Sequence, residues 1–305
     1  MKLGLETFSY HLALGSGQMD IFEFIRRAHA FGLDGVQINM VGKPPKFGHL
    51  GGIESDHLRS VCAMTERFGL YVEIDTNGTD EISLNRGIDV CKALGAKTLR
   101  TYQLPTGDVK HDMAEAVQNL RQILPRCGKE NVRIAVENHE FETASDVLSV
   151  VGSLDSEWIG AMLDNGNGMM SWEDPDVTVE TLAPFAFTSH FKDHVVIEED
   201  GQPIVVGTTL GQGSMNLKKH FQILSQRLPW INIEVCYNYR ATFRRAPEDG
   251  AGACLGQGAF GVIPGPFDPA FIPAKGQAGD EIYEWENQSV EESVEYMKNL
   301  RAECA

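Results

Sequence analysis

In Val136-Glu137-Asn138-His139, an apolar run ends on a carboxylate and an imidazole. Three later stretches repeat this arrangement: Leu163-Asp164-Asn165-Gly166-Asn167, His190-Phe191-Lys192-Asp193 and Ile233-Glu234-Val235. An apolar run bounded by polar and glycine residues is typical of a buried strand. The chain therefore places three carboxylates and one imidazole near the carboxyl ends of four predicted strands.

The spacing of these stretches predicts a (β/α)8 barrel. Glu137 and Asp164 lie 27 positions apart, and Asp164 and His190 lie 26 apart. Such a barrel spreads about 250 residues over eight strand–helix units, or roughly 30 residues per unit. The interval in sequence from His190 to Glu234 is longer, which we attribute to an additional loop. Predicted strands 5 to 8 then direct four side chains to one spot on the face that holds the active site in such barrels.

The rest of the chain repeats the same unit. Predicted helices end on an apolar residue and a glycine at Phe31-Gly32, Phe68-Gly69 and Leu94-Gly95, where glycine adopts the left-handed C′ conformation easily. We expect strands at residues 3–9, 35–38, 70–74, 98–100, 132–137, 159–164, 186–191 and 231–235. A last helix is expected from Ser289, with Glu292 completing a capping box. The alternation predicts one α/β domain, a TIM barrel, over residues 1–305.

Residues 236–288 interrupt this pattern between predicted strand 8 and the last helix. The segment is rich in Gly and Pro, and loops of this length in a compact domain are usually functional or disordered. Because it starts just after Glu234, we expect it to cover the active site or to contact another subunit, either a second copy or a partner protein. A plain surface excursion is the alternative.

Composition excludes several classes of protein. The formal net charge of −17 argues against nucleic-acid binding, because no basic surface could neutralise phosphates. The six cysteines contain no Cys-x-x-Cys pair, which indicates reduced thiols in a cytoplasmic protein. No signal-peptide pattern and no run long enough to span a membrane is present in the sequence.

The four converging side chains predict a metal site. Three carboxylates and one imidazole suit Mn²⁺, Mg²⁺ or Co²⁺ better than a thiol-rich zinc site does. The alternative is that Glu137, Asp164, His190 and Glu234 are unrelated polar residues at strand ends. Their regular spacing on successive strands favours the metal.

These residues also give the chain a resemblance to the xylose isomerase-like TIM-barrel family, which includes sugar epimerases, inosose dehydratase and relatives of endonuclease IV. The similarity runs from Gly4-Leu5-Glu6-Thr7-Phe8-Ser9 to Ile233-Glu234. Its more specific parts are Glu137-Asn138-His139, Asp164 with Asn167, His190-x-Lys192-Asp193 and Gly211-Gln212-Gly213. The resemblance implies that Glu137, Asp164, His190 and Glu234 hold one catalytic divalent ion, with Mn²⁺ preferred over Mg²⁺ or Co²⁺.

The resemblance does not identify the substrate. Gln37 stands where the family often has Glu, and the 236–288 insertion exceeds the usual length. The endonuclease branch is excluded, because its members need several metals and a basic groove.

Further residues are assigned to the substrate. His139 lies on the same strand face as Glu137, and either donates a proton to a substrate oxygen or is hydrogen-bonded at the strand end. Lys192 is expected to hold a substrate oxygen or carboxylate, the alternative being an ion pair with Asp193. Asn167 is expected to orient Asp164 or contact substrate, and His11 to line the pocket. Arg240, close to Arg244 and Arg245, suits a carboxylate or phosphate, although pairing with the many acids would explain all three.

The expected function is that of a metal-dependent isomerase or epimerase acting on a sugar or keto sugar. Glu137 and Glu234 would remove and return a proton beside the carbonyl, through an enediolate. One alternative is a lyase of the same family, either a decarboxylase of an oxo sugar acid or a subunit that cleaves C-glycosides of 3-oxo sugars. Another is a non-catalytic sugar-binding subunit.

Overall fold

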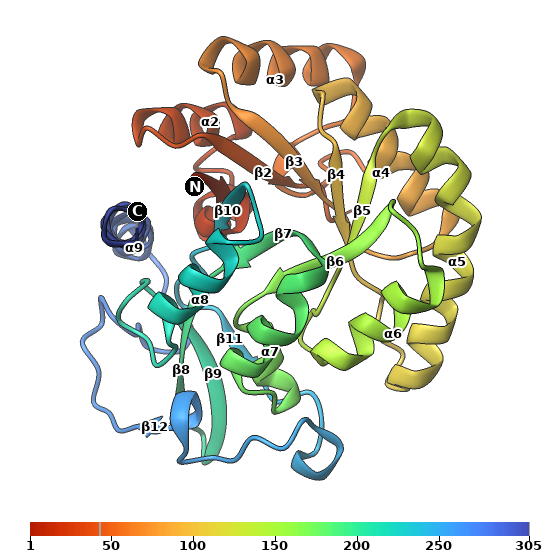
Figure 1. Ribbon diagram of the computed structural model, residues 1–305. Coiled ribbons are helices and arrows are strands. Elements are labelled where there is room, and N and C mark those ends of the chain that lie inside the picture. The colour runs from red at the N-terminus through yellow and green to blue at the C-terminus, as the bar shows by residue number, and fades with distance from the viewer. Residues whose placement is uncertain (43, 305) are drawn as a thin grey trace.

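The computed structural model describes residues 1–42 and 44–304, and eight parallel strands close into a barrel at its centre (Figure 1). Their order around the barrel is β1-β10-β7-β6-β5-β4-β3-β2. The strands are β1 (Lys2–Glu6), β2 (Gly35–Asn39), β3 (Tyr71–Asp75), β4 (Thr98–Thr101), β5 (Arg133–Glu137), β6 (Ile159–Asp164), β7 (Ala186–Phe191) and β10 (Trp230–Ile233). The predicted TIM barrel is confirmed.

Helices surround the barrel. They are α1 (His11–Ser16), α2 (Ile21–Ala30), α3 (Ser55–Phe68), α4 (Glu81–Leu94), α5 (Val109–Glu130), α6 (Ala144–Leu154), α7 (Pro175–Leu182), α8 (Leu217–Ser225) and α9 (Asp280–Glu303). α3 and α4 end as predicted, at Gly69 and Gly95 with φ of 67° and 71°. Within the described residues, no helix combines the length and apolar character needed to cross a membrane.

The lower part of the barrel interior is filled by a polar network. Asn232 Nδ2 and the Thr188 hydroxyl donate to Glu73 Oε2 over 2.7 and 2.6 Å. The Tyr71 hydroxyl donates to Asn232 Oδ1 over 2.8 Å. These four side chains come from β3, β7 and β10. Asn232 lies two residues before Glu234, so the network forms the floor beneath the predicted site.

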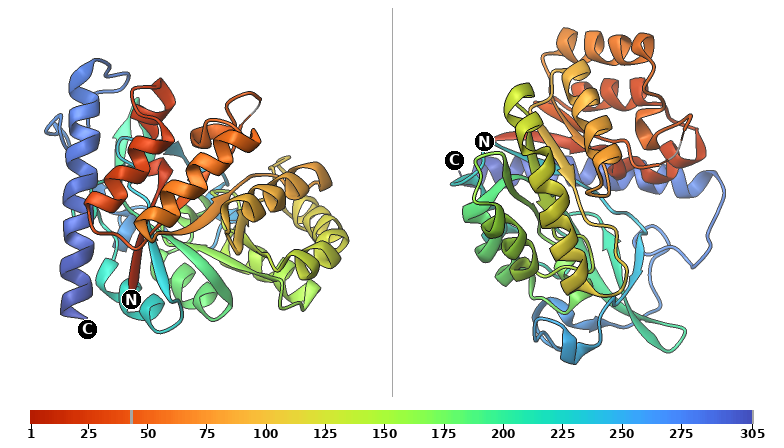
Figure 2. Two further views of the ribbon diagram at one scale, coloured as in Figure 1. Left: turned by 90° about the horizontal axis from the view of Figure 1, so that it is seen from above. Right: turned by 90° about the vertical axis from the view of Figure 1, so that its right-hand side faces the viewer.

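A second, four-stranded sheet in the order β11-β9-β8-β12 extends beyond the barrel (Figure 2). β8 (Asp193–Glu199) and β9 (Gln202–Thr208) form an antiparallel hairpin directly after β7. This hairpin, and not a simple loop, accounts for the long step between His190 and Glu234. β11 (Arg240–Thr242) and β12 (Val262–Ile263) come from the segment after β10 and add to the two edges of the hairpin.

The expected start of the last helix is wrong. α9 begins at Asp280, so the segment between β10 and α9 ends at residue 279. Ser289 is buried inside the helix, and its hydroxyl lies 2.8 Å from that of Thr209. The first turn lacks a Ser, Thr, Asp or Asn cap and begins after Gly279, but Asp280 and Glu281 there are favourable for the helix dipole. Strand 1 is also shorter than expected, because a 3-10 turn follows from Thr7 to Tyr10.

Candidate metal centre and pocket

The four predicted ligands meet at the carboxyl end of the barrel. Glu137, Asp164 and His190 are at or near the last positions of β5, β6 and β7, and Glu234 directly follows β10. His190 Nδ1 lies 3.2 Å from Glu137 Oε1, 3.5 Å from Asp164 Oδ2 and 3.1 Å from Glu234 Oε2. All four side chains are buried. A single small region therefore contains the whole predicted set.

The donor atoms of these side chains fit a divalent cation. Several of these atoms make no hydrogen bond among the described residues: both oxygens of Glu137, Asp164 Oδ2, Glu234 Oε2 and both nitrogens of His190. Three of the oxygens lie within ion-pair distance of Arg100 or Lys192. Ligand atoms of Glu137, Asp164 and His190 all lie within 4.8 Å of one another. Buried polar atoms without partners are unfavourable unless something satisfies them. Oxygen-rich sets with one imidazole suit Mn²⁺, Mg²⁺ or Co²⁺.

Asp164 is held with one oxygen directed at this centre. Its Oδ1 accepts the backbone N–H groups of Gly166 and Asn167 over 2.8 and 2.7 Å. Burial opposes the charged form, but Lys192 and His190 hold the pKa of Asp164 below its usual value. The carboxylate is therefore ionised, and Oδ2 remains available. Asn167 orients Asp164 through its backbone, while its side chain lines the pocket.

Two buried cations contact the candidate ligands. Lys192 Nζ lies 2.7 Å from Asp164 Oδ2, also contacts Glu234 Oε2, and donates to Asn167 Oδ1 over 3.2 Å. Arg100, on β4, pairs with Glu137 Oε2. Sequence reasoning missed Arg100, although a charged residue at the carboxyl end of a predicted strand is the same signal that identified Glu137. The alternative pairing of Lys192 with Asp193 is wrong.

Asp193 instead binds the Gly211-Gln212-Gly213 turn. Its Oδ2 accepts the N–H groups of Gly211 and Gly213 over 3.0 and 2.9 Å. A Cβ at Gly213 would come within 2.1 Å of the Asp193 carboxylate, so this position requires glycine. The two motifs that looked separate in the sequence form one structural unit.

Asp75 and Glu6 are two further buried acids near the centre, and neither was predicted from the sequence. Asp75 Oδ2 lies 3.4 Å from His190 Nε2. Histidines that bind metals usually direct the other ring nitrogen to a carboxylate or carbonyl. Burial, and then the charges of Glu234 and Asp75, raise the pKa of Glu6 well above its usual value.

A cavity of about 230 Å³ opens above this centre. Its walls include the predicted residues His139, Asn167, Lys192 and Glu234. The complete lining is Phe8, Asn39, Val41, Arg100, Tyr102, His139, Glu140, Asn167, Lys192, Glu234, Cys236 and Tyr239. The rings of His139 and Tyr102 stack with centroids 3.8 Å apart. Burial, followed by the charges of Arg100 and Lys192, lowers the pKa of His139 to about 3, so its ring is neutral near pH 7.

Two predicted substrate residues lie outside the cavity lining. His11 stacks on Phe8, with ring centroids 4.5 Å apart, and its Nε2 is 2.9 Å from the Tyr237 carbonyl oxygen. Arg240 donates to Glu199 Oε1 over 3.0 Å and to the Pro273 carbonyl. Arg240 therefore pairs with an acid of the same chain and does not line this cavity.

Arg244 and Arg245 likewise pair with Glu140 and Asp146. Pairing with acids of the same chain thus explains all three arginines of the segment.

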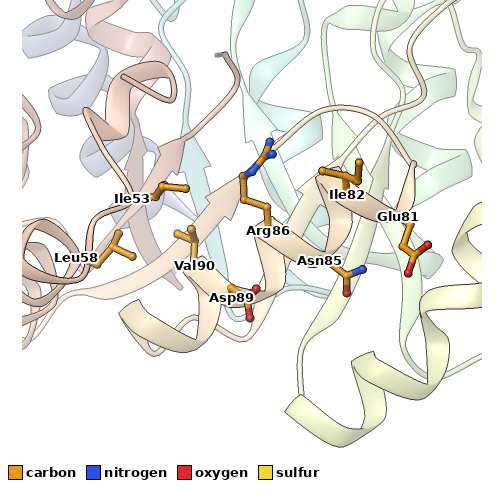
Figure 3. A pocket seen from close by; sticks show the side chains of 8 residues that line it. All are labelled: Ile53, Leu58, Glu81, Ile82, Asn85, Arg86, Asp89 and Val90. Carbon is orange, nitrogen blue, oxygen red and sulfur yellow. The ribbon is translucent and has the colours of Figure 1, made fainter. Parts of the chain in front are cut away.

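A larger groove of about 630 Å³ lies elsewhere, along α3 and α4 (Figure 3). It is lined by Ile53, Leu58, Glu81, Ile82, Asn85, Arg86, Asp89 and Val90. This lining contains no imidazole and none of the buried acids described above. The groove is therefore not a candidate for the metal centre.

Comparison with known proteins agrees with this architecture. A family model described as "Xylose isomerase-like TIM barrel" matches residues 25–253. The chain is 23% identical over 257 residues to the uncharacterized protein YihM of Escherichia coli K12, covering 82% of this chain and 78% of that protein. It is 29% identical over 175 residues to 3-oxo-isoapionate decarboxylase of Pectobacterium atrosepticum, covering 53% of this chain and 63% of that enzyme.

Among solved structures, D-psicose 3-epimerase of Clostridium cellulolyticum H10 superposes with a TM-score of 0.61 at 13% identity. The match covers 96% of this chain and 98% of that enzyme. At this identity, the likeness shows a shared fold.

Proposed function

This chain belongs to the xylose isomerase-like TIM-barrel family, and we propose that it is a divalent-metal-dependent enzyme acting on a sugar derivative beside its carbonyl group. The observation that carries the proposal is the convergence of three buried carboxylates on His190, with ligand atoms that make no hydrogen bond among the described residues. Mn²⁺ is the preferred ion, and Mg²⁺ or Co²⁺ would also suit this set. A bound ion would polarise the substrate carbonyl and stabilise negative charge on its oxygen.

We favour decarboxylation of an oxo sugar acid. Arg100 and Lys192 are buried cations in the cavity wall, and such groups favour an anionic substrate over a neutral one. The 29% identical relative is named as a decarboxylase of a 3-oxo acid. In this reaction the C–COO⁻ bond breaks, CO₂ leaves, and the electron pair stays on the substrate as an enediolate. Solvent then supplies a proton through Glu137 or Glu234, and this proton takes the place of the carboxyl group.

Isomerisation or epimerisation is the second candidate. It is supported by the position of Glu137 and Glu234, which approach His190 from β5 and from the end of β10. One carboxylate would remove a proton beside the carbonyl and the other would return one. Return to the opposite face gives an epimer, and return to the other carbon gives an isomer. Cleavage of a C-glycoside of a 3-oxo sugar would use the same enediolate.

The test is incubation with Mn²⁺ in D₂O with two substrate panels, oxo sugar acids and neutral keto sugars. A decarboxylase releases CO₂ and places one deuteron on the product carbon. An isomerase or epimerase releases no CO₂ and introduces deuterium into a neutral sugar. Chelation of the metal should abolish either activity. Turnover that survives chelation would contradict the proposal, and sugar binding without turnover would indicate a binding subunit.

We also propose that residues 236–279 cover the pocket. Cys236 and Tyr239 belong to the cavity lining. The Tyr239 hydroxyl and the Arg244 guanidinium both contact the carboxylate of Glu140, which lies on the loop after β5. These contacts support a cover that is attached across the mouth of the barrel. A contact with a second copy or a partner subunit is the alternative use of the same segment.

A further inference from the structure

Two buried asparagines each follow a candidate metal ligand. Asn138 follows Glu137 at the end of β5, and Asn165 follows Asp164 at the end of β6. Both side chains are fully buried. Neither takes part in the chemistry proposed above, so another role must explain why a polar amide occupies each position.

Both asparagines make the same pair of hydrogen bonds to the next strand. Asn138 Oδ1 accepts the Asp164 N–H over 3.0 Å, and its Nδ2 donates to the Asp164 carbonyl over 2.9 Å. Asn165 Oδ1 accepts the Lys192 N–H over 2.9 Å, and its Nδ2 donates to the Lys192 carbonyl over 3.1 Å. A primary amide offers one acceptor and two donors, so it can replace a peptide group of a neighbouring strand. The side chains thus continue the strand pairing beyond the point where β5 and β6 end.

These bonds act on two functional side chains. Asn138 binds the backbone of Asp164, and the N–H groups of Gly166 and Asn167 bind its Oδ1, so Oδ2 is the oxygen directed at the centre. Lys192, whose backbone is bound by Asn165, brings Nζ to 2.7 Å from that same oxygen.

A further pair of groups fixes the orientation of the Asn165 amide. Asn165 Nδ2 lies 3.2 Å from His220 Nδ1, and His220 Nε2 lies 2.8 Å from Asp176 Oδ1. With the amide reversed, its oxygen would face the Lys192 carbonyl oxygen. The hydrogen-bonded series Asp176–His220–Asn165 therefore selects the amide orientation that bonds both backbone groups of Lys192.

We propose that Asn138 and Asn165 are positioning residues, Asn138 for Asp164 in the metal centre and Asn165 for Lys192 beside it. This inference rests on the metal centre of the proposed function. It implies different consequences for the two residues, because Asp164 is a candidate ligand and Lys192 is not. A purely structural role would give the two substitutions the same effect.

The test compares N138A and N165A with N85A. Asn85 on α4 accepts from the Arg126 guanidinium of α5, so its loss removes an asparagine contact between two outer helices, away from the centre. Mn²⁺ affinity is measured by calorimetry, and exchange of the Asp164 and Lys192 amide hydrogens is measured by mass spectrometry. N138A should weaken Mn²⁺ binding by about 10-fold or more, as loss of ligand-orienting groups does, and speed exchange at Asp164. N165A should speed exchange at Lys192 without weakening Mn²⁺ binding, and N85A should change neither.

The outcomes separate the two proposals. If the unmodified protein binds no Mn²⁺, the proposed metal centre fails. If it binds Mn²⁺ but N138A and N165A weaken binding equally, or N138A does not weaken it, the positioning roles are overturned. Should an alanine variant fail to fold, N138S and N165S replace it, since serine keeps a polar group at the site but is too short to make both bonds. Unchanged exchange at both Asp164 and Lys192 in the serine variants would also overturn the inference.

Discussion

Arg100 and Lys192 set the charge of the candidate centre. Three carboxylates exceed the charge of one divalent ion, and Asp75 lies directly behind His190. The guanidinium next to Glu137 and the ammonium next to Asp164 and Glu234 offset this excess. The same two cations face the cavity, so they are also suited to hold a carboxylate of the substrate.

Replacing Lys192 tests this second role. K192M should raise the KM for an oxo sugar acid by about 10-fold or more, because a hydrogen bond to a charged group contributes about 1.5–3 kcal/mol. The matched control is K218M, since Lys218 forms an exposed pair with Glu303 that contributes little. Steady-state kinetics provides the measurement. Equal KM values for K192M and K218M would contradict an anionic substrate.

Glu137 and Glu234 are expected to transfer protons as well as bind metal. E137Q and E234Q keep the size of the side chain but remove the titrating group. Turnover should fall by about 10²-fold or more, the usual contribution of acid–base groups, while Mn²⁺ binding weakens less. E157Q, at an exposed position, serves as the control. Near-normal turnover in either site variant would rule out its role in proton transfer.

At the scale of secondary structure, the segment after β10 contacts two other parts of the chain, the hairpin after β7 and the loop after β5. β11 and β12 pair with the hairpin that follows β7, whereas Tyr239 and Arg244 contact Glu140 on the loop after β5. Glu140 adopts a left-handed conformation with φ of 63° although it is not glycine. This geometry directs its carboxylate to the segment that we propose as a cover.

Loss of the Tyr239 hydroxyl tests the cover. Y239F removes the contact with Glu140, so amide exchange in residues 236–245 should accelerate and the KM should rise, while the fold is retained. Y283F on α9 is a matched control outside the cavity lining. Hydrogen exchange and kinetics provide the measurements. A variant with unchanged exchange and unchanged KM would show that this contact does not hold a cover in place.

At the scale of the whole molecule, buried histidines make stability depend on pH. Burial, followed by the charge of Lys192, lowers the pKa of His194 from 6.5 to about 4. Between pH 6.5 and 4 the unfolded chain binds a proton that the folded protein does not, so stability falls as the pH falls through this window. Burial raises the pKa of Glu142 to about 8 and of Glu286 to about 7. These two shifts make the folded protein more stable as the pH falls, which opposes the effect of His194. The contribution of His194 must therefore be measured as a difference.

H194N isolates that contribution. The free energy of unfolding of the unmodified protein, minus that of H194N, should decrease by up to roughly 3 kcal/mol from pH 7 to pH 4. Denaturant unfolding at several pH values gives this difference, with exposed His111 replaced in H111N as the control. A difference that does not change with pH would contradict the buried, neutral state of His194.

Local patterns predicted the repeated units of this fold, and long-range contacts account for most of what they missed. β6 and β7 have the predicted bounds, because each is a bounded apolar run. Arg100 and Asp75 join the centre only through the closure of the barrel, which no local pattern records. Arg240 was assigned to the substrate because it clusters with two other arginines in an acidic chain. Its partner Glu199 lies 41 residues away in the sequence, so no local pattern identifies the pair. The start of α9 was missed because its first turn has no capping side chain.

The most direct test of the metal centre is a Mn²⁺ titration followed by a crystal structure of the loaded protein. We expect one ion per chain, bound by Glu137, Asp164, His190 and Glu234 at about 2.0–2.6 Å. D164N should weaken binding by about 10-fold or more, while D249N, at an exposed position, should not. Absence of a bound ion, an ion elsewhere in the chain, or any two of the four side chains more than about 6 Å apart around it would contradict the metal centre.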